Sequence, residues 1–194
     1  PSSKFKEEVA ARVAKHAAGH PDRKGIKLER LVPQVSAQAV QHQYVRLEIN
    51  QPMARVARII VTGATTTPSS NVNELVARPL QMWRELDDVI LRLRFHHPDI
   101  GLVLLETRGD RDQQEREDTA LLEHRAHWLV NETLLLGKRV LKRLECSARS
   151  TFALVNQESC FVGSLSELAW AADRAYLLED DKVQMGVHAI NRAT

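Results

Sequence analysis

A run of four apolar residues, Leu102 to Leu105 in IGLVLLETRG, constrains the fold of this chain more than any other stretch. A strand that is apolar on both faces is typical of the centre of a parallel sheet that is covered on two sides. The FALV stretch at 152–155 reads as a second buried strand. A helical pattern that begins with Pro79 at its first position precedes the first strand, and a second one from Leu121 to Leu144 follows it. This order of strands and helices predicts an α/β fold with parallel crossovers.

Weaker patterns complete the core. Alternating apolar and polar residues predict two strands, one from Tyr44 and one over Val56 to Thr62, which we expect to form a hairpin. A short helix after FALV should lead into a strand at 175–178, and a last short strand is expected near 182–190. Residues 109–118 read as a charged loop.

The first part of the chain differs from the rest. Charged and apolar residues at helical spacing predict a helix over 4–18, and residues 19–40 have the scattered Gly, Pro, Ser and Gln of a connecting segment. We therefore expect a helix and linker from a preceding domain at 1–40, and a core domain at 41–194. The sequence begins without an initiator Met, which fits a piece of a longer chain.

Composition excludes several classes of protein. With 27 Lys and Arg against 25 Asp and Glu among 194 residues, the net charge is +2, and basic residues alternate with acids instead of forming a stripe. We therefore expect no nucleic-acid partner. No apolar run approaches the roughly 18 residues of a membrane span, so we expect no membrane association. Cys146 and Cys160 have no disulfide or zinc-site spacing, which favours a cytoplasmic location.

Two loops could hold a ligand, because ligands in α/β folds bind beyond the carboxyl ends of the strands. One loop covers Thr107 to Asp118, and the other covers Asn156 to Ser166. The second loop leads through Gly163 and Ser164 into the start of a helix, where free backbone N–H groups could stabilise an oxyanion. Gly163 and Ser164 are therefore candidate oxyanion-hole residues.

Glu167 has two interpretations. Ser164-Leu165-Ser166-Glu167 fits the S-x-x-E capping box, in which Ser and Glu satisfy each other's backbone N–H groups. Alternatively, Glu167 is a catalytic acid beside the oxyanion loop. The residues alone favour the cap, because caps are common at helix starts.

Other reactive side chains carry weaker signals. His124 and His127 have an i, i+3 spacing compatible with a metal, but no carboxylate follows at matching spacing, so we expect no metal site. Cys160 lies beside the oxyanion loop, yet no His is near it in the sequence, which favours a packing role.

The stretch at 159–180, SCFVGSLSELAWAADRAYLLED, resembles the signature of the crotonase (enoyl-CoA hydratase/isomerase) family. In that signature a Gly-rich loop leads into Glu-Leu-Ala, a few small residues, Asp and a strand. Over residues 44–180, GLVLLETRGD, HRAHW and SARSTFAL narrow the resemblance to the second crotonase-like half of the benzoyl-CoA-dihydrodiol lyase family. Residues 1–40 are similar to the segment that joins the two halves. The resemblance implies a crotonase-like spiral of ββα units, incomplete at the C-terminus of this chain.

The resemblance also implies site residues. Crotonases hold the enolate oxygen of a thioester with two backbone N–H groups and usually add two carboxylates for proton transfer. Ser164 falls at the position of one N–H donor, and Glu167 falls at the position of the first carboxylate. Ala189 stands where the second carboxylate should be, and Thr107–Asp112 replaces the loop that provides the other donor. These departures imply that this segment is mainly a scaffold, with Glu167 as a cap or vestige and the catalytic residues elsewhere.

The function implied is that of a ring-opening lyase in aerobic benzoate degradation. Such an enzyme adds water to 2,3-epoxybenzoyl-CoA and releases formate and a semialdehyde CoA ester, with no cofactor besides the CoA thioester of the substrate. A homodimer is implied, because crotonases are commonly oligomeric. Two alternatives stay open: an enoyl-CoA hydratase or isomerase with its own site, and a non-catalytic domain for acyl-CoA binding or dimerisation.

Overall fold

The computed structural model describes residues 4–19 and 25–192 of the chain. They fall into two compact units, the first ending at Arg30 and the second beginning at Leu31. In the first unit, α1 (Phe5–Ala18) confirms the helix expected over 4–18. None of its residues is buried, and Phe5 is 69% exposed.

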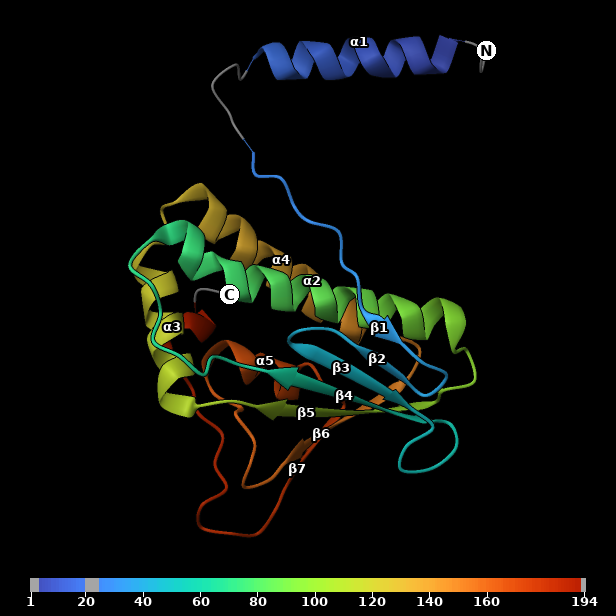
Figure 1. Ribbon diagram of the computed structural model, residues 1–194, viewed down its shortest axis with the longest axis vertical. Coiled ribbons are helices and arrows are strands. Elements are labelled where there is room, and N and C mark those ends of the chain that lie inside the picture. The colour runs from blue at the N-terminus through green and yellow to red at the C-terminus, as the bar shows by residue number, and fades with distance from the viewer. Residues whose placement is uncertain (1–3, 20–24, 193–194) are drawn as a thin grey trace. The chain divides into compact units, whose positions relative to one another are not determined.

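The second unit holds all the strands that the structure describes (Figure 1). Its elements in chain order are β1 (Gln34–Val35), β2 (Ala39–Gln41), β3 (Val45–Ile49), β4 (Val56–Thr62), α2 (Val72–His96), β5 (Leu102–Arg108), α3 (Arg111–Glu123), α4 (Trp128–Glu145), β6 (Ser150–Val155), η2 (Gly163–Leu165), α5 (Glu167–Trp170), β7 (Arg174–Leu177) and η3 (Ala189–Arg192).

The strands form one seven-stranded sheet in chain order. Strands β1 to β4 are antiparallel neighbours, and β4 to β7 are parallel neighbours. The hairpin of β3 and β4 and the parallel crossovers were both predicted, and both are confirmed. The sheet begins at Gln34, which is earlier than the core boundary that we expected at 41. The strands β1 and β2 are too short to show an alternating pattern, so the sequence carries little sign of them.

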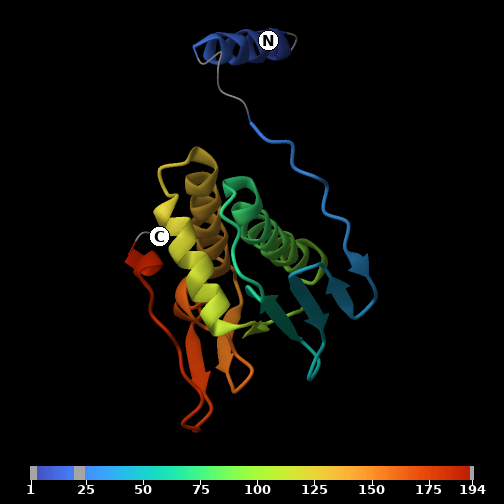
Figure 2. The same ribbon diagram turned by 60° about the vertical axis from the view of Figure 1, so that its left-hand side comes forward.

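The two long helices α2 and α4 pack on one face of the sheet (Figure 2). Every second residue of the central strands points into that core, including Ile59, Val103 and Leu105, which are at most 2% exposed. Leu102 and Leu104 point to the opposite face and are only half-buried. The expectation that the sheet is covered on two sides is therefore wrong for the residues that the structure describes.

The helix α2 begins earlier than expected. It starts at Val72, where the Asn71 side chain accepts the Asn73 N–H at 2.9 Å, and Pro79 lies inside it instead of at its first position. An interior proline costs about 3 kcal/mol. The burial of Leu75 and Val76 in a second apolar cluster with α4 offsets that cost.

The charged loop expected at 109–118 is instead helical. Helix α3 starts after Asp110, whose side chain accepts the Gln113 N–H at 3.0 Å, and it ends at Glu123. The long helix expected from Leu121 is thus two helices, and the His127 side chain caps the second one.

The last strand expected near 182–190 does not form. A single parallel bridge joins Val162 to Gly186, and Ala189 begins the short helix η3. This segment therefore crosses the end of the sheet beside the candidate loop without extending the sheet.

Candidate functional site

The candidate site lies where β5 and β6 end. The loop after β6 turns at Gly163 into η2, which is followed by the four-residue helix α5. Two residues separate the end of β5 from the start of helix α3, which packs against η2. The two loops predicted to hold a ligand, 107–118 and 156–166, thus meet at one end of the sheet.

The Ser164 backbone N–H, the predicted oxyanion donor, is already hydrogen-bonded within the protein. It donates to Oδ2 of Asp118 in α3 at 2.8 Å, and the Ser164 hydroxyl donates to Oδ1 of the same carboxylate at 2.8 Å. The Gln114 side-chain amide donates to both Asp118 Oδ1 and Ser164 Oγ at 3.2 Å. Asp118 and Gln114 are 0% exposed and Ser164 is 9% exposed. An intrinsic carboxylate therefore occupies the position that a substrate oxyanion would need.

The charge of this carboxylate depends on its burial. Desolvation raises the pKa of Asp118 to about 7, although the hydrogen bonds from Ser164 and Gln114 act in the opposite direction. The neighbouring carboxylate of Glu117 raises it further, and Glu117 is itself paired with Arg78. A buried acid with a shifted pKa is often functional, but here each of its oxygens is committed to a hydrogen bond within the fold.

Gly163 makes the approach of Asp118 possible. Its φ of +54° lies in the left-handed region. A Cβ at this position would lie 1.9 Å from Asp118 Oδ2, closer than any real contact. The Gly163 N–H donates to the Gly186 carbonyl at 3.3 Å, so this second candidate donor also has a partner inside the protein.

The predicted capping box is not formed. Both donors of Ser164 are directed to Asp118, and the N-cap of α5 is Ser166, whose hydroxyl donates to the Gly163 carbonyl at 2.7 Å. The Glu167 carboxylate accepts from the Asn191 amide at 2.7 Å, and the same amide donates to the Gly163 carbonyl at 2.8 Å. The Glu167 carboxylate thus contacts η3.

The site also contains residues that the sequence did not reveal. Gln114 accepts the Ala64 N–H at 2.9 Å and an Arg78 N–H at 3.2 Å through Oε1, so it links the segment after β4 to α2 and α3. The Arg78 guanidinium also donates through Nε to Glu117 at 2.7 Å. The i, i+4 spacing of Gln114 and Asp118 was the only signal in the sequence, and polar residues at that spacing usually lie on a solvated face.

The other candidate side chains are structural. Imidazole Nδ1 of His124 lies 2.9 Å from the Ala120 carbonyl, and that of His127 accepts the Leu129 N–H, so both rings cap helix ends. Among the residues with described positions, no group of three or more His, Cys, Asp or Glu is placed to hold a metal ion. No helix in the same part of the chain is long and apolar enough to cross a bilayer.

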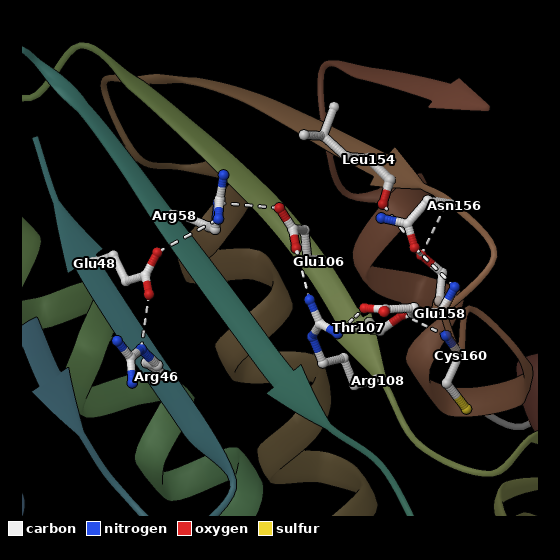
Figure 3. Close-up of polar contacts among 11 residues, drawn as sticks. Arg46, Glu48, Arg58, Glu106, Thr107, Arg108, Leu154, Asn156, Glu158 and Cys160 are labelled. Carbon is white, nitrogen blue, oxygen red and sulfur yellow. Dashed lines mark hydrogen bonds and ion pairs between the residues drawn. The ribbon is translucent and has the colours of Figure 1, made fainter. Parts of the chain in front are cut away.

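Cys160 is held beneath the loop. It is 0% exposed, and its backbone N–H donates to Thr107 Oγ1 at 3.0 Å (Figure 3). Desolvation raises the pKa of its thiol to about 11. The thiolate that nucleophilic chemistry requires is therefore scarce at neutral pH.

This burial predicts a difference between the two thiols. We expect iodoacetamide at neutral pH to alkylate the exposed Cys146 in the native protein and to alkylate Cys160 only after unfolding. Peptide mass spectrometry of labelled native and denatured samples measures both sites. Native labelling of Cys160 as fast as Cys146 would contradict the packing role.

Comparisons with known proteins agree with the fold and the resemblance. No family model matches the chain. Benzoyl-CoA-dihydrodiol lyase of Aromatoleum evansii is 37% identical over 201 residues, which cover 98% of this chain and 36% of the lyase. The enoyl-CoA hydratase of Geobacillus kaustophilus superimposes with a TM-score of 0.51 and 17% identity, over 80% of this chain and 53% of the hydratase. The predicted crotonase fold is therefore confirmed, and the chain spans about a third of the lyase and about half of the hydratase.

Proposed function

Because this chain has the crotonase fold and is similar over nearly its whole length to a segment of benzoyl-CoA-dihydrodiol lyase, we propose that it is part of a lyase acting on a CoA thioester. The substrate in this proposal is 2,3-epoxybenzoyl-CoA. The enzyme adds water, opens the ring and releases formate and a semialdehyde CoA ester, as a step of aerobic benzoate degradation. Within that enzyme, residues 31–194 act as a scaffold and do not carry the reaction.

The main support for the scaffold role is that the Ser164 N–H already donates a hydrogen bond to the Asp118 carboxylate. An enolate oxygen at this site would compete with a carboxylate oxygen 2.8 Å from the same donor. Above about pH 7, where Asp118 is ionised, the two anions would also repel each other in a buried environment, where such repulsion is poorly screened. Binding a thioester here would require α3 to move, and that would break the Gln114 bonds to Ala64 and Ser164.

The residues at the positions of the two carboxylates support the same role. Glu167 is bonded to Asn191, and Ala189 has no group that can transfer a proton. One carboxylate of the usual pair is therefore missing, and the other one connects two short helices. The proposed reaction needs no cofactor other than the CoA thioester of the substrate.

The test is formate release by the full-length protein with 2,3-epoxybenzoyl-CoA, for the wild type and for Glu167→Gln. We expect formate from both, with rates within about threefold of each other. The glutamine keeps an oxygen for Asn191 but loses the charge of that acceptor, which costs stability by about 1 kcal/mol.

Two results would overturn parts of this proposal. A loss of rate of about 100-fold or more at an unchanged melting temperature would make Glu167 catalytic, because removing a group that acts in the transition state has effects of this size. An absence of formate from the wild type, together with tight binding of a CoA ester, would replace the lyase by a domain that binds acyl-CoA without turnover.

A further inference from the structure

A cavity lies at the opposite end of the sheet from the candidate site. Ile100 precedes β5 and Arg149 precedes β6, so both stand at the amino ends of the strands whose carboxyl ends form that site. The cavity is open to solvent and has a volume of about 550 Å³, which is within the range of small-molecule sites. We call it the basal cavity. Its lining residues are Arg94, Pro98, Ile100, Cys146, Ala148 and Arg149.

Arg149 is held firmly at the edge of this cavity. Its Nε donates to the Ile100 carbonyl at 2.9 Å, and its Nη2 donates to the carbonyls of Leu93 and His97 at 2.7 and 2.9 Å. These carbonyls belong to the end of α2 and to the segment that leads from it into β5. The three bonds fix the plane of the guanidinium, so its remaining donors have a defined direction.

Both arginines of the cavity keep donors for another acceptor. A guanidinium has five N–H donors, and the described residues accept from Nε and Nη2 of Arg149 and leave Nη1 without a partner. Arg94 is exposed, and its Nη2 donates to the Cys146 carbonyl at 3.4 Å, which is long for such a bond. A ligand in the cavity could therefore accept hydrogen bonds from two guanidinium groups.

The positive charges of the cavity are only partly compensated. None of the ion pairs between described residues includes Arg94 or Arg149. Burial lowers the pKa of Arg149 and the like charge of Arg94 lowers it further, whereas Asp99 acts in the opposite direction with a smaller effect. Glu145, which precedes Cys146 in the chain, is paired with Lys142 at 2.9 Å. A bound anion would stabilise both guanidinium groups.

We propose that the basal cavity binds a small organic anion whose carboxylate or phosphate group lies between Arg94 and Arg149. The planar fork of arginine donors suits both of these groups. The other walls of the cavity come from Pro98, Ile100 and Ala148, which offer apolar contacts to the body of such a ligand. The proposal does not depend on the reaction proposed above, because the cavity is at the other end of the strands.

Cys146 provides a direct readout, because it is exposed and lines the cavity. The experiment follows alkylation of Cys146 by iodoacetamide in the full-length protein, using peptide mass spectrometry, with increasing benzoate, phenyl phosphate or neutral benzamide. We expect both anions to slow alkylation in a saturable way, with half-protection at about 1 mM for ligands of this size. Benzamide should not protect at the same concentrations. The anion that protects at the lower concentration identifies the preferred group.

Substitutions of Arg94 separate charge from structure. Arg94→Gln should raise the half-protecting concentration at least about tenfold, because it removes one of the two charged donors. Arg94→Lys keeps the charge and should stay within about threefold of the wild type. Arg125→Gln is the matched control, since it removes the charge of an exposed arginine beyond the other end of α4, a helix of 18 residues and about 27 Å. It should leave protection unchanged.

The two arginines also predict a preference for anionic reagents. Iodoacetate and iodoacetamide react with the same thiolate, so the ratio of their rates does not depend on how much thiolate is present. At about 50 mM salt we expect this ratio at Cys146 to be at least about threefold higher in the native protein than in the unfolded protein, and to fall at about 500 mM. The absence of this preference, equal protection by benzamide, no protection by either anion, or full protection in Arg94→Gln would each overturn the proposal.

Discussion

Replacing Gly163 with alanine should lower the free energy of unfolding by at least about 3 kcal/mol, a loss that few single substitutions outside a large core cavity produce. The left-handed backbone at φ +54° costs a residue with a Cβ about 1–2 kcal/mol. The new methyl group would also lie 1.9 Å from Asp118 Oδ2, so the carboxylate must move away. Moving it breaks its bonds to Ser164 and leaves buried donors unpaired, at about 1–3 kcal/mol.

Chemical denaturation of the purified variants measures this loss. Gly101→Ala is the matched control, because a Cβ there would meet nothing nearer than 4.0 Å. In an Asp118→Ala background the cost of Gly163→Ala should shrink to that of the backbone alone, because the group with which the methyl collides is gone. A loss below about 1 kcal/mol in the wild-type background would mean that Asp118 does not depend on a glycine at 163.

The apolar strands were predictable because their own residues specify them. Strands β3 to β6 have alternating or continuous apolar patterns. The spacing of apolar residues differs enough between helices and strands to distinguish the two. The loop from Gly163 to Glu167 was also recognisable, because Gly, Ser and a following Glu are typical of a helix start. What these residues contact was not predictable.

The partners of that loop come from elements with no apolar signature. Helix α3 buries Gln114, Glu117 and Asp118, which pair with groups supplied by other elements. Glu85 in α2 is another case, since it is 1% exposed and accepts the backbone N–H groups of Tyr44 and Val45 at 2.7 and 3.1 Å. Sequence patterns assign such residues to the surface, because the local sequence does not show which distant donor will form a hydrogen bond with them.

The capping box failed for the same reason. Its signature is local, and Ser164 and Glu167 have the right identities and spacing. Asp118 offers both donors of Ser164 an acceptor oxygen in a buried site, and in its ionised form these bonds are stronger than those of a neutral cap. The tertiary partner therefore replaced the local one.

Removing the Asp118 carboxyl as Asp118→Asn should change how stability depends on pH. The pKa of this group is about 7 in the folded protein and 3.8 in its ordinary state, so between those values the folded state binds one proton more than the unfolded state. The free energy of unfolding therefore falls as the pH rises through this window, by about 1.4 kcal/mol per pH unit for this group. Below about pH 4 and above about pH 7 its contribution is constant.

Urea denaturation from pH 4 to pH 8 measures the free energy of unfolding of the wild type and of Asp118→Asn. The wild-type value minus the variant value isolates the contribution of the Asp118 carboxyl. We expect this difference to fall by about 3–4 kcal/mol as the pH rises from 4 to 7, because the wild type loses stability relative to the variant. Asp112→Asn, an exposed aspartate of the same helix, controls for the loss of one carboxyl group. Stability curves for the wild type and Asp118→Asn that stay parallel across the window would show that burial does not perturb Asp118.

The same titration bears on the candidate donor. Both protonation states of Asp118 keep an acceptor oxygen on the Ser164 N–H, because a protonated carboxyl still has a carbonyl oxygen. Lowering the pH therefore stabilises the fold without freeing the donor for a substrate. If this segment is a scaffold, the pH dependence of formate release by the full-length protein should be the same for the wild type and Asp118→Asn wherever both are folded. A change in that profile that follows the Asp118 titration would assign the buried carboxyl to the chemistry.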